Sequence, residues 1–291
     1  MTSGGAAASP TGGLGAGAIR ELASRHGIRP SKTLGQHFLI DPNLARAIAA
    51  EAGAAPGVRI VEVGAGLGSL TVALAAAGAD VLAIEFDRAL VPALLEVVNG
   101  LPSVRVLAAD AMKLDWAAEL GDGDWTMAAN LPYNIATPLV LDVLEHVPAI
   151  GTFVVTVQRE VGERWAGVPG EEGYGAVSVK VAMRARANVV RRVAPSVFWP
   201  RPGVDSVVVR LDRLDAPPVD VDPEALRRVV DAGFAERRKT MRNALVRLGV
   251  DRGRAADVLA RAGVGPRARA EELDLDALAR VTAAVEEELR S

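Results

Sequence analysis

The stretch Glu62-Val63-Gly64-Ala65-Gly66-Leu67-Gly68 decides the fold of this chain, because it joins a β-branched run to a helical pattern. The run at residues 58–63 has the composition of a buried strand, and the pattern at residues 69–77 predicts a helix that Gly78 ends. Glycines at such a junction let the backbone pass close to a ligand at the start of the helix. The stretch therefore predicts a strand, a ligand-binding turn and a helix in succession.

The same alternation of strand and helix continues along the first half of the chain. Strands are predicted at residues 58–63, 81–84, 104–108, 125–129 and 153–157, and helices at residues 69–77, 89–98 and 137–146. This order implies parallel strands joined by right-handed crossovers. Glu85, Asp110 and Asn130 each follow a predicted strand. We expect them together at the carboxyl edge of the sheet, where open α/β sheets bind ligands.

The remainder of the chain predicts the end of the sheet and a separate group of helices. Residues 189–193 and 207–211, joined by a proline-rich segment, form a hairpin that brings the sheet to seven strands. Residues 216–218 (Ala-Pro-Pro) are a predicted linker, and from Pro223 the pattern is helical. We expect an α/β, Rossmann-like, mostly parallel sheet in a domain at residues 18–214, and a small all-helical domain at residues 215–291.

Composition narrows the possible functions. The 291 residues include no Cys, which excludes disulfides, thiol nucleophiles and Cys-based metal sites and agrees with a reducing cytoplasm. His26, His37 and His146 have no metal-ligand spacing, and no apolar run approaches the roughly 18–20 residues of a membrane span. Residues 1–17 lack the features of a signal peptide and are predicted to be a disordered tail. The net charge of -3 means that any basic surface is local.

Two acidic residues at strand ends indicate which ligand the glycine turn binds. Glu85 lies about 20 residues beyond the turn, where a carboxylate can accept hydrogen bonds from both hydroxyls of a ribose. Asp110 can accept a hydrogen bond from an adenine amino group. The turn departs from the dinucleotide pattern G-x-G-x-x-G, because Ser69 occupies the sixth position. These features favour a site for S-adenosylmethionine, with an NAD site or a glycine turn beside two solvated acids as alternatives.

The hexapeptide Gln36-His37-Phe38-Leu39-Ile40-Asp41 precedes the first strand of this alternation. Asp41 and Pro42 are typical of a helix N-terminus, with Asp41 as the capping residue. We interpret the residues before them as a lip over the ligand site. His37 by itself is more typical of a structural hydrogen-bonding residue.

The tetrapeptide Asn130-Leu131-Pro132-Tyr133 indicates the reaction. The lone pair of an adenine N6 amino group is delocalised into the ring, so a methylating site must hold this nitrogen with its lone pair towards the methyl donor. The Asn130 side-chain oxygen and the Leu131 carbonyl can accept the two N–H bonds. Pro132 stiffens the turn, and Tyr133 offers a face on which the base can stack. A strand-end turn with a half-buried Tyr is the alternative.

Six motifs in order resemble those of one enzyme family. They are Leu34-Gly35-Gln36-His37-Phe38-Leu39, the glycine stretch at residues 62–68, Asn130-Leu131-Pro132-Tyr133-Asn134, residues 157–164 (Val-Gln-Arg-Glu-Val-Gly-Glu-Arg), residues 198–206 (Phe-x-Pro-x-Pro-x-Val-Asp-Ser) and residues 234–243 (Phe-x-x-Arg-Arg-Lys-Thr-Met-Arg-Asn). Together, over residues 29–291, they resemble the KsgA-type (RsmA) small-subunit rRNA adenine dimethyltransferases. The resemblance implies a methyltransferase sheet followed by a small helical domain.

The resemblance also implies the substrate and the cofactor residues. The substrate is a pair of adjacent adenosines in the hairpin near the 3′ end of 16S rRNA, each converted to N6,N6-dimethyladenosine within an assembling 30S particle. The family's S-adenosylmethionine positions carry over to His37, Leu39, Gly64, Glu85, Asp110 and Asn130. The expected cofactor residues also include Gln36 of the lip and Gly66 and Gly68 of the glycine turn. His37 departs from the family, which usually has Asn at this position.

Base stacking completes the expected mechanism. The target base must leave its stack at a cost on the order of a few kcal/mol. Stacking between Tyr133 and Phe198 is expected to offset this cost, at roughly 1–3 kcal/mol per base. Phe198 precedes Pro-x-Pro, which favours an exposed, rigid placement over a place in the core. Catalysis is therefore assigned to residues 130–133 with Phe198, with neither a metal nor a protein general base.

The predicted RNA contact lies in the helical region. Residues 227–269 contain twelve Arg and Lys against four acids, on a chain whose net charge is -3. Within this segment Arg237, Arg238, Lys239 and Arg242 cluster, as expected for residues that contact phosphates. A solvated helical face is the alternative.

Other functions share parts of this pattern. An Erm-type 23S rRNA methyltransferase, which confers antibiotic resistance, shares the sheet and the Asn-x-Pro turn, but residues 131–134 and 237–240 argue against it. A DNA adenine methyltransferase is expected to carry Pro-Pro in the turn and a larger recognition domain. A 30S assembly checkpoint factor that acts chiefly by binding, and a binding module without cofactor, are the non-catalytic alternatives. No pattern indicates an obligate dimer, so we expect a monomer.

Overall fold

The computed structural model describes residues 13–31, 33–236 and 239–290. The chain forms two compact units, one made of Met1–Arg159 and Val189–Leu211 and the other of Glu160–Asn188 and Asp212–Ser291. Each unit has its own cluster of buried apolar residues. Each is therefore stabilised largely by contacts within itself.

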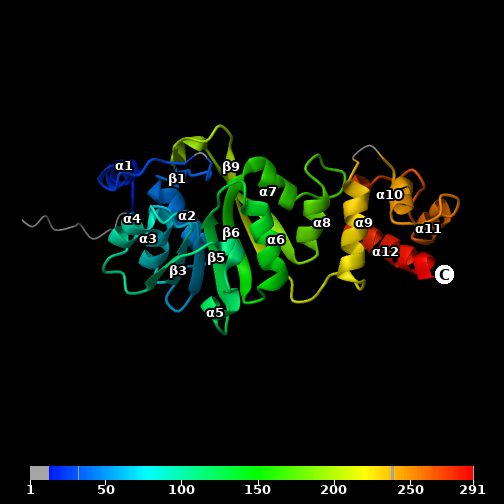
Figure 1. The fold of residues 1–291 in the computed structure, drawn as a ribbon, viewed down its shortest axis with the longest axis horizontal. Helices are drawn as coiled ribbons and strands as arrows, with labels where there is room; N and C mark the ends of the chain where they lie inside the picture. The colour runs from blue at the N-terminus through cyan, green and yellow to red at the C-terminus, as the bar shows by residue number, and fades with distance from the viewer. Residues whose placement is uncertain (1–12, 32, 237–238, 291) are drawn as a thin grey trace, which may run out of the picture. The chain divides into compact units, whose positions relative to one another are not determined.

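A seven-stranded sheet forms the framework of the fold, with the strand order β4-β3-β2-β5-β6-β9-β7 (Figure 1). Its strands are β2 (Arg59–Val63), β3 (Asp80–Glu85), β4 (Val104–Ala108), β5 (Trp125–Asn130), β6 (Ile150–Gln158), β7 (Ala185–Val193) and β9 (Ser206–Arg213). The five strands β4, β3, β2, β5 and β6 are each parallel to the next in this order. The chain order reverses between β2 and β5, so their carboxyl ends lie at a topological switch point, where ligands bind.

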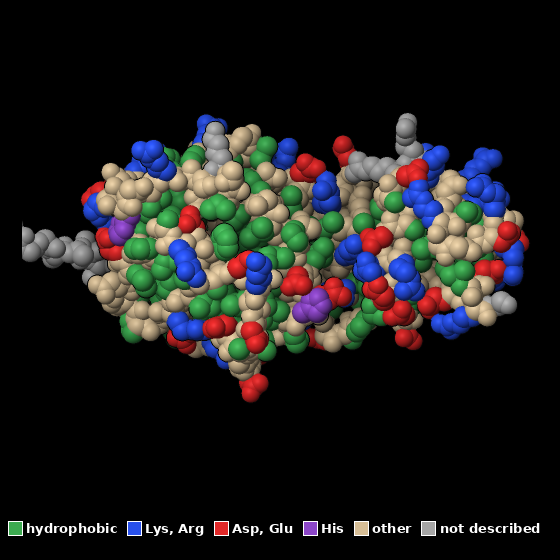
Figure 2. Space-filling model, viewed as in Figure 1, with side chains coloured by type: hydrophobic (Ala, Val, Ile, Leu, Met, Phe, Trp, Pro, Cys, Tyr) green, Lys and Arg blue, Asp and Glu red, His purple; other side chains and the backbone are tan. Residues whose placement is uncertain are grey.

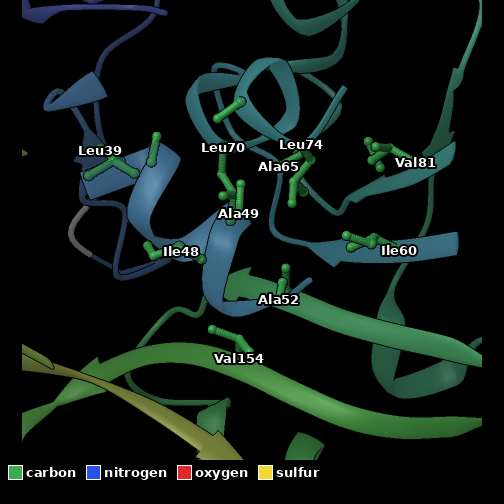
Figure 3. Packing of buried hydrophobic residues seen from close by; sticks show 14 of the residues in the cluster. Leu39, Ile48, Ala49, Ala52, Ile60, Ala65, Leu70, Leu74, Val81 and Val154 are labelled. Carbon is green, nitrogen blue, oxygen red and sulfur yellow. The ribbon is translucent and has the colours of Figure 1, made fainter. Parts of the chain in front are cut away.

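Helices of the first unit cover the sheet and bury its apolar strands. They are α1 (Ala16–Arg25), α2 (Pro42–Glu51), α3 (Ser69–Ala76), α4 (Val91–Val97), α5 (Trp116–Leu120) and α6 (Ala136–His146), with the 3-10 helices η1 (Ala111–Lys113) and η2 (Pro195–Val197). Ile48 of α2 and Leu74 of α3 pack with Ile60 of β2 in one cluster (Figure 3). The neighbouring Val61 is also buried, so both faces of β2 are covered, as in other parallel sheets.

The predicted fold is confirmed, with element ends that differ by a few residues, and one further pairing was not predicted. Strand β1 (Phe38–Leu39) pairs antiparallel with β8 (Phe198–Trp199), which places Leu39 opposite Phe198. Two-residue strands carry too little periodicity to be recognised in a sequence. Their pairing connects the segment before α2 to the proline-rich segment that precedes β9.

The start of the chain differs from the expected disordered tail at residues 1–17. Helix α1 begins at Ala16, so residues 16 and 17 are helical, and residues 1–12 lie outside the described part of the chain. Ile19 and Leu22 are buried in a cluster with Phe38, Leu67 and Leu90. Burial of these side chains stabilises a helix that the Gly-rich composition does not favour.

The second unit is helical, and its limits differ from the domain boundary expected after residue 214. Its helices are α7 (Arg159–Trp165), α8 (Ala176–Ala182), α9 (Pro223–Phe234), α10 (Met241–Arg247), α11 (Ala255–Arg261) and α12 (Leu275–Arg290), with the 3-10 helix η3 (Ala270–Glu272). Tyr174 lies in its core and donates a hydrogen bond to the Leu273 carbonyl at 2.7 Å. Lys180 forms an ion pair with Asp231 at 2.7 Å. Residues 160–188 therefore pack with the C-terminal helices, which a linker composition at residues 216–218 could not indicate.

Candidate active site

One cavity collects most of the predicted site residues. It has a volume of about 300 Å³ and lies in the first unit, over the carboxyl ends of β2, β3, β4 and β5. The predicted residues in its lining are Gln36, His37, Leu39, Gly64, Gly66, Glu85, Asp110, Asn130, Leu131, Pro132 and Tyr133. Gly68 and Phe198 are described residues that do not line it. A concave site of this size holds a small organic ligand.

The glycine turn shapes one wall of the cavity. Gly64 and Gly66 have positive φ angles of 75° and 58°, which glycine adopts without the strain that a Cβ adds. A Cβ on Gly66 would lie 3.2 Å from the Phe38 ring, so the turn passes close to β1. Gly68 has a different role, because a Cβ there would lie 2.9 Å from Val97 of α4. Contrary to the prediction, Gly68 faces α4, and its small size allows α3 to begin against that helix.

Glu85 ends β3 with its carboxylate held by backbone groups. Its Oε2 accepts a hydrogen bond from the Gly66 N–H at 2.7 Å, and its Oε1 accepts one from the Asp87 N–H at 2.7 Å. Burial raises the pKa of Glu85, and these two N–H donors oppose the rise. Each carboxylate oxygen has a second lone pair. The fixed carboxylate can therefore accept further hydrogen bonds from hydroxyl groups in the cavity.

Hydrogen bonds join the predicted lip at residues 36–41 to the loop after β3 and to α3. Gln36 Nε2 donates to Asp87 Oδ2 at 2.7 Å. The Leu39 carbonyl accepts a hydrogen bond from Ser69 Oγ at 2.6 Å, which joins β1 to the first turn of α3. Asp41 caps α2 as predicted. The lip is thus held at both of its ends.

Asn130 ends β5 with its side-chain amide in a defined orientation. Its Nδ2 donates a hydrogen bond to the His37 carbonyl at 2.8 Å. Because a carbonyl only accepts, the amino group must face His37, and Oδ1 faces the other way. The Leu131 N–H donates to the Thr156 carbonyl of β6 at 3.2 Å, and the Leu131 side chain is buried. The turn after β5 therefore presents the Asn130 oxygen from a fixed backbone.

Tyr133 and His37 form a stacked pair in the wall of the cavity. Their ring centroids lie 5.5 Å apart with an angle of 30° between the planes. The Tyr133 hydroxyl lies 2.9 Å from Ser206 Oγ, and His37 Nδ1 donates to the Pro200 carbonyl at 2.7 Å. Burial raises the pKa of Tyr133, so the phenol stays protonated at neutral pH. His37 covers part of one Tyr133 face, so a base would stack against the uncovered part of the ring.

Phe198 does not have the exposed position that its place before Pro-x-Pro suggested. Only 3% of the residue is exposed, and it packs in the main core with Leu39 and Ala45. The pairing of β8 with β1 accounts for this position, because it sets Phe198 beside the buried Leu39. In this structure Tyr133 lines the cavity without Phe198.

The structure adds two apolar side chains that sequence reasoning missed. Phe86 and Met112 line the cavity, yet they are 59% and 40% exposed. Large apolar side chains exposed at the edge of a cavity mark a surface that an apolar or aromatic ligand covers. Their position next to the strand-end acids was the available signal. Asp110 itself accepts a hydrogen bond from the Met112 N–H at 3.0 Å.

Glu62 is a third residue that the predictions did not include. It lines the cavity at the end of β2, is 2% exposed, and accepts a hydrogen bond from Thr71 Oγ1 at 2.6 Å. Burial raises the pKa of Glu62 to about 8, against the effect of the Thr71 hydrogen bond. A single acid among the apolar residues Ile60, Val61 and Val63 of β2 was the signal. Such a carboxyl ionises readily only when a cation binds beside it.

The predicted RNA-contacting residues are only partly within the described chain. Arg237 and Arg238 lie outside it, whereas Lys239 and Arg242 are exposed. Other cations of this region form ion pairs: Arg227 with Glu224 and Asp231, Arg247 with Glu236, Arg254 and Arg261 with Glu288, and Arg269 with Glu271. On the face drawn in Figure 2, Lys and Arg side chains likewise lie among Asp and Glu side chains over these helices. The charge count over residues 227–269 omitted Glu224, Glu271 and Glu288, which lie outside that segment.

A metal centre and a membrane-spanning helix are both absent from the part of the chain that the structure describes. Within it, no group of three or more His, Asp or Glu side chains is arranged to hold a metal ion. No helix of that part is both long and apolar enough to cross a membrane.

The sequence matches a family model over nearly its whole length. The family is described as ribosomal RNA adenine dimethylase, and the match covers residues 28–286. The chain is 44% identical over 269 residues to ribosomal RNA small subunit methyltransferase A of Thermobifida fusca, which spans 90% of this chain and 93% of that protein. It is 43% identical over 287 residues to the protein of the same name from Cutibacterium acnes, which spans 95% of this chain and 96% of that protein.

Two solved structures share the fold along most of the chain. A dimethyladenosine transferase from Plasmodium falciparum superposes with a TM-score of 0.75 at 23% identity, covering 87% of this chain and 98% of that chain. The 23S rRNA methyltransferase ErmE superposes with a TM-score of 0.67 at 26% identity, covering 86% of this chain and 99% of that chain.

Proposed function

Because the chain belongs to the ribosomal RNA adenine dimethylase family, we propose that it modifies two adjacent adenosines in the 3′-terminal hairpin of 16S rRNA. The chain is an S-adenosylmethionine-dependent rRNA adenine dimethyltransferase. Each target adenosine becomes N6,N6-dimethyladenosine, within the 30S particle or its precursor. The relatives named small subunit methyltransferase A, at 43–44% identity, support the small subunit as the substrate. We further propose that the enzyme is a cytoplasmic monomer that acts in ribosome biogenesis.

The cavity residues fit S-adenosylmethionine. Gly64 and Gly66 adopt positive φ angles and line the cavity with main chain, so a ligand can lie against the backbone of the glycine turn. Glu85, held by two backbone N–H groups, is assigned to the ribose hydroxyls. Asp110 is assigned to the adenine, between the exposed apolar surfaces of Phe86 and Met112. When bound, this cofactor supplies an electrophilic methyl group on a sulfonium, a cation that also suits the buried acid at the end of β2.

The orientation of the Asn130 amide is the observation that carries the acceptor side of the proposal. Its Oδ1, directed away from His37, accepts one N–H of the target amino group. The Leu131 carbonyl accepts the other, so the nitrogen lone pair leaves conjugation with the ring. Tyr133 stacks on the base and holds it out of the RNA stack, an interaction worth about 1–3 kcal/mol. The proton lost after each transfer passes to water, because alkylation makes the amino proton acidic.

The likeness to ErmE supports one alternative, methylation of 23S rRNA. That identity is 26%, against 43–44% for the relatives named after the small subunit. The larger identity over a similar share of the chain favours 16S rRNA.

Methyl transfer with mapped products tests the proposal. Labelled S-adenosylmethionine is supplied to unmethylated 30S particles, 50S particles and naked 16S rRNA. We expect two adjacent dimethyladenosines near the 3′ end of 16S rRNA, on 30S particles. Asn130→Ala should lower the rate on the order of a hundredfold, the usual effect of removing one hydrogen-bonding group that acts on the reacting atoms. The exposed Asn99→Ala is the matched control and should be as active as the wild type.

The outcomes separate the alternatives. Label in 23S rRNA would place the enzyme with ErmE, and absence of label from all three substrates would refute the proposal. If Asn130→Ala binds 30S particles normally and still supports their maturation in cells, binding and not catalysis would be the main role.

A further inference from the structure

One long segment of the chain carries cations without any acid. Residues 173–204 contain no Asp or Glu, although the whole chain has 36 acids against 33 cations. The six cations in the segment are Lys180, Arg184, Arg186, Arg191, Arg192 and Arg201. It is the longest stretch of the chain without an acid, although the shorter stretch 237–250 also carries five cations and no acid. It lies outside the region in which the sequence predicted RNA contact.

Part of this segment is an open edge of the sheet. β7 is the last strand in the order, with β9 beside it and no described strand on its other side. Residues 188–192 of β7 are all exposed. Successive strand residues point to opposite faces of a sheet, so neither face is covered along this stretch. Val189 and Val190, at 38% and 39% exposed, are apolar residues left open to solvent there.

The arginines of this edge are available to a ligand. Within the described chain, Arg191 and Arg192 are exposed and have no hydrogen-bond or ion-pair partner. Arg254 and Arg261, in contrast, share the carboxylate of Glu288 at 2.7 and 2.9 Å. An arginine in an ion pair must give up that pair to bind a phosphate, whereas Arg191 and Arg192 exchange only water.

Protection of the edge does not account for the pattern. Charged side chains of either sign keep an exposed edge strand from pairing with another chain, so edge protection by itself does not require a long segment free of acids. The absence of acids over residues 173–204 points to a negatively charged partner. The proposed substrate is a polyanion, and arginine binds phosphate through a planar, bidentate group of donors.

We infer that the edge formed by residues 188–192 of β7 is an RNA-binding surface that contacts backbone phosphates of the rRNA substrate. This inference rests on the proposed function. Arg191 and Arg192 point to opposite faces of the strand and bind phosphates on either side of it. The contact is independent of base sequence, because phosphates carry none. It adds to binding of the particle and leaves the cofactor cavity unchanged.

The salt dependence of binding tests the inference. The affinity of the full-length protein for unmethylated 30S particles is measured at several salt concentrations, for the wild type and for Arg191→Ala/Arg192→Ala. Each lost phosphate contact lowers the slope of log affinity against log salt by roughly 1. We expect a slope smaller by roughly 2 and an affinity lower by about tenfold to a hundredfold at 0.1 M salt. S-adenosylmethionine affinity, measured by calorimetry, should not change.

Two matched variants separate a phosphate contact from other effects. Arg191→Lys/Arg192→Lys keeps both charges and should keep most of the slope. Arg20→Ala/Arg105→Ala removes two exposed charges from elsewhere and should leave the slope unchanged. An unaltered slope in the double alanine variant, or weaker binding at the same slope, overturns the inference. In that case the wild type still methylates 16S rRNA, whereas failure of the proposed function itself leaves 16S rRNA unlabelled by the wild type.

Discussion

Replacing Glu62 with Gln should stabilise the protein at neutral and alkaline pH. The Glu62 carboxyl is 2% exposed and lies near a second buried acid, Glu85. Burial raises its pKa from 4.5 to about 8, and the hydrogen bond from Thr71 offsets only part of that rise. Gln has nearly the same shape, keeps an oxygen that accepts from Thr71, and cannot ionise.

The sign and size of the effect follow from this pKa. Between pH 4.5 and about 8 the folded chain keeps a proton that the unfolded chain has released. The free energy of unfolding therefore falls as pH rises through this range, and the stability present at low pH is lost above about pH 8. The shift from 4.5 to about 8 corresponds to about 5 kcal/mol, at about 1.4 kcal/mol per unit. This value is an upper limit, because water entry and relaxation reduce the cost of a buried charge.

Urea denaturation of the ligand-free protein across this pH range measures the effect. The measured quantity is the free energy of unfolding of Glu62→Gln minus that of the wild type. This difference should increase from about pH 5 to about pH 8 and then level off. The exposed Glu172→Gln is the control, and its difference from the wild type should stay flat. A constant difference for Glu62→Gln over this range would refute the reasoning, because Glu62 would then ionise as readily in the folded chain as in the unfolded one.

Three further predictions concern the glycines and the aromatic rings. Gly66→Ala and Gly68→Ala should both lower Tm, because both positions have positive φ angles, 58° and 83°. Only Gly66→Ala should also weaken S-adenosylmethionine binding in calorimetry, because Gly66 lines the cavity and Gly68 does not; equal effects on binding would contradict these roles. Tyr133→Phe should keep the stacking surface and cost about 1 kcal/mol of stability, whereas Tyr133→Ala should raise KM for 30S particles in steady-state kinetics. Phe198→Ala should lower the unfolding free energy by about 3–5 kcal/mol in urea denaturation. At temperatures below its Tm, the folded variant should have the same kcat as the wild type. A lower kcat without a loss of stability would instead support a role for Phe198 in stacking on the base.

The departure at His37 from the Asn that is usual in the family has a simple structural reading. The group that orients Asn130 is the His37 carbonyl, which any residue at this position provides. The imidazole instead donates to the Pro200 carbonyl and stacks on Tyr133. The substitution therefore leaves the contact to Asn130 in place and changes the surroundings of the stacking ring.

The sequence by itself determined the order of the strands and helices and the position of the site. A β-branched run, a glycine turn and a helical pattern are local signals, each readable within about ten to fifteen residues. Parallel crossovers then bring strand ends together, which is why Glu85, Asp110 and Asn130 could be assigned to one cavity before the fold was known. The resemblance over six motifs added the substrate class.

Tertiary structure alone decided the features that depend on contacts between distant segments. Phe198 is buried because β8 pairs with β1, about 160 positions earlier, and no local pattern around residue 198 encodes that partner. Gly68 faces α4 because of how α3 and α4 pack, and residues 160–188 join the C-terminal helices through Tyr174. The paired state of Arg254 and Arg261 depends in the same way on Glu288. Arg191, in contrast, lies in β7, which has a described strand, β9, on one side only. Side-chain chemistry is local and readable from sequence, but burial and pairing depend on which distant segments come into contact.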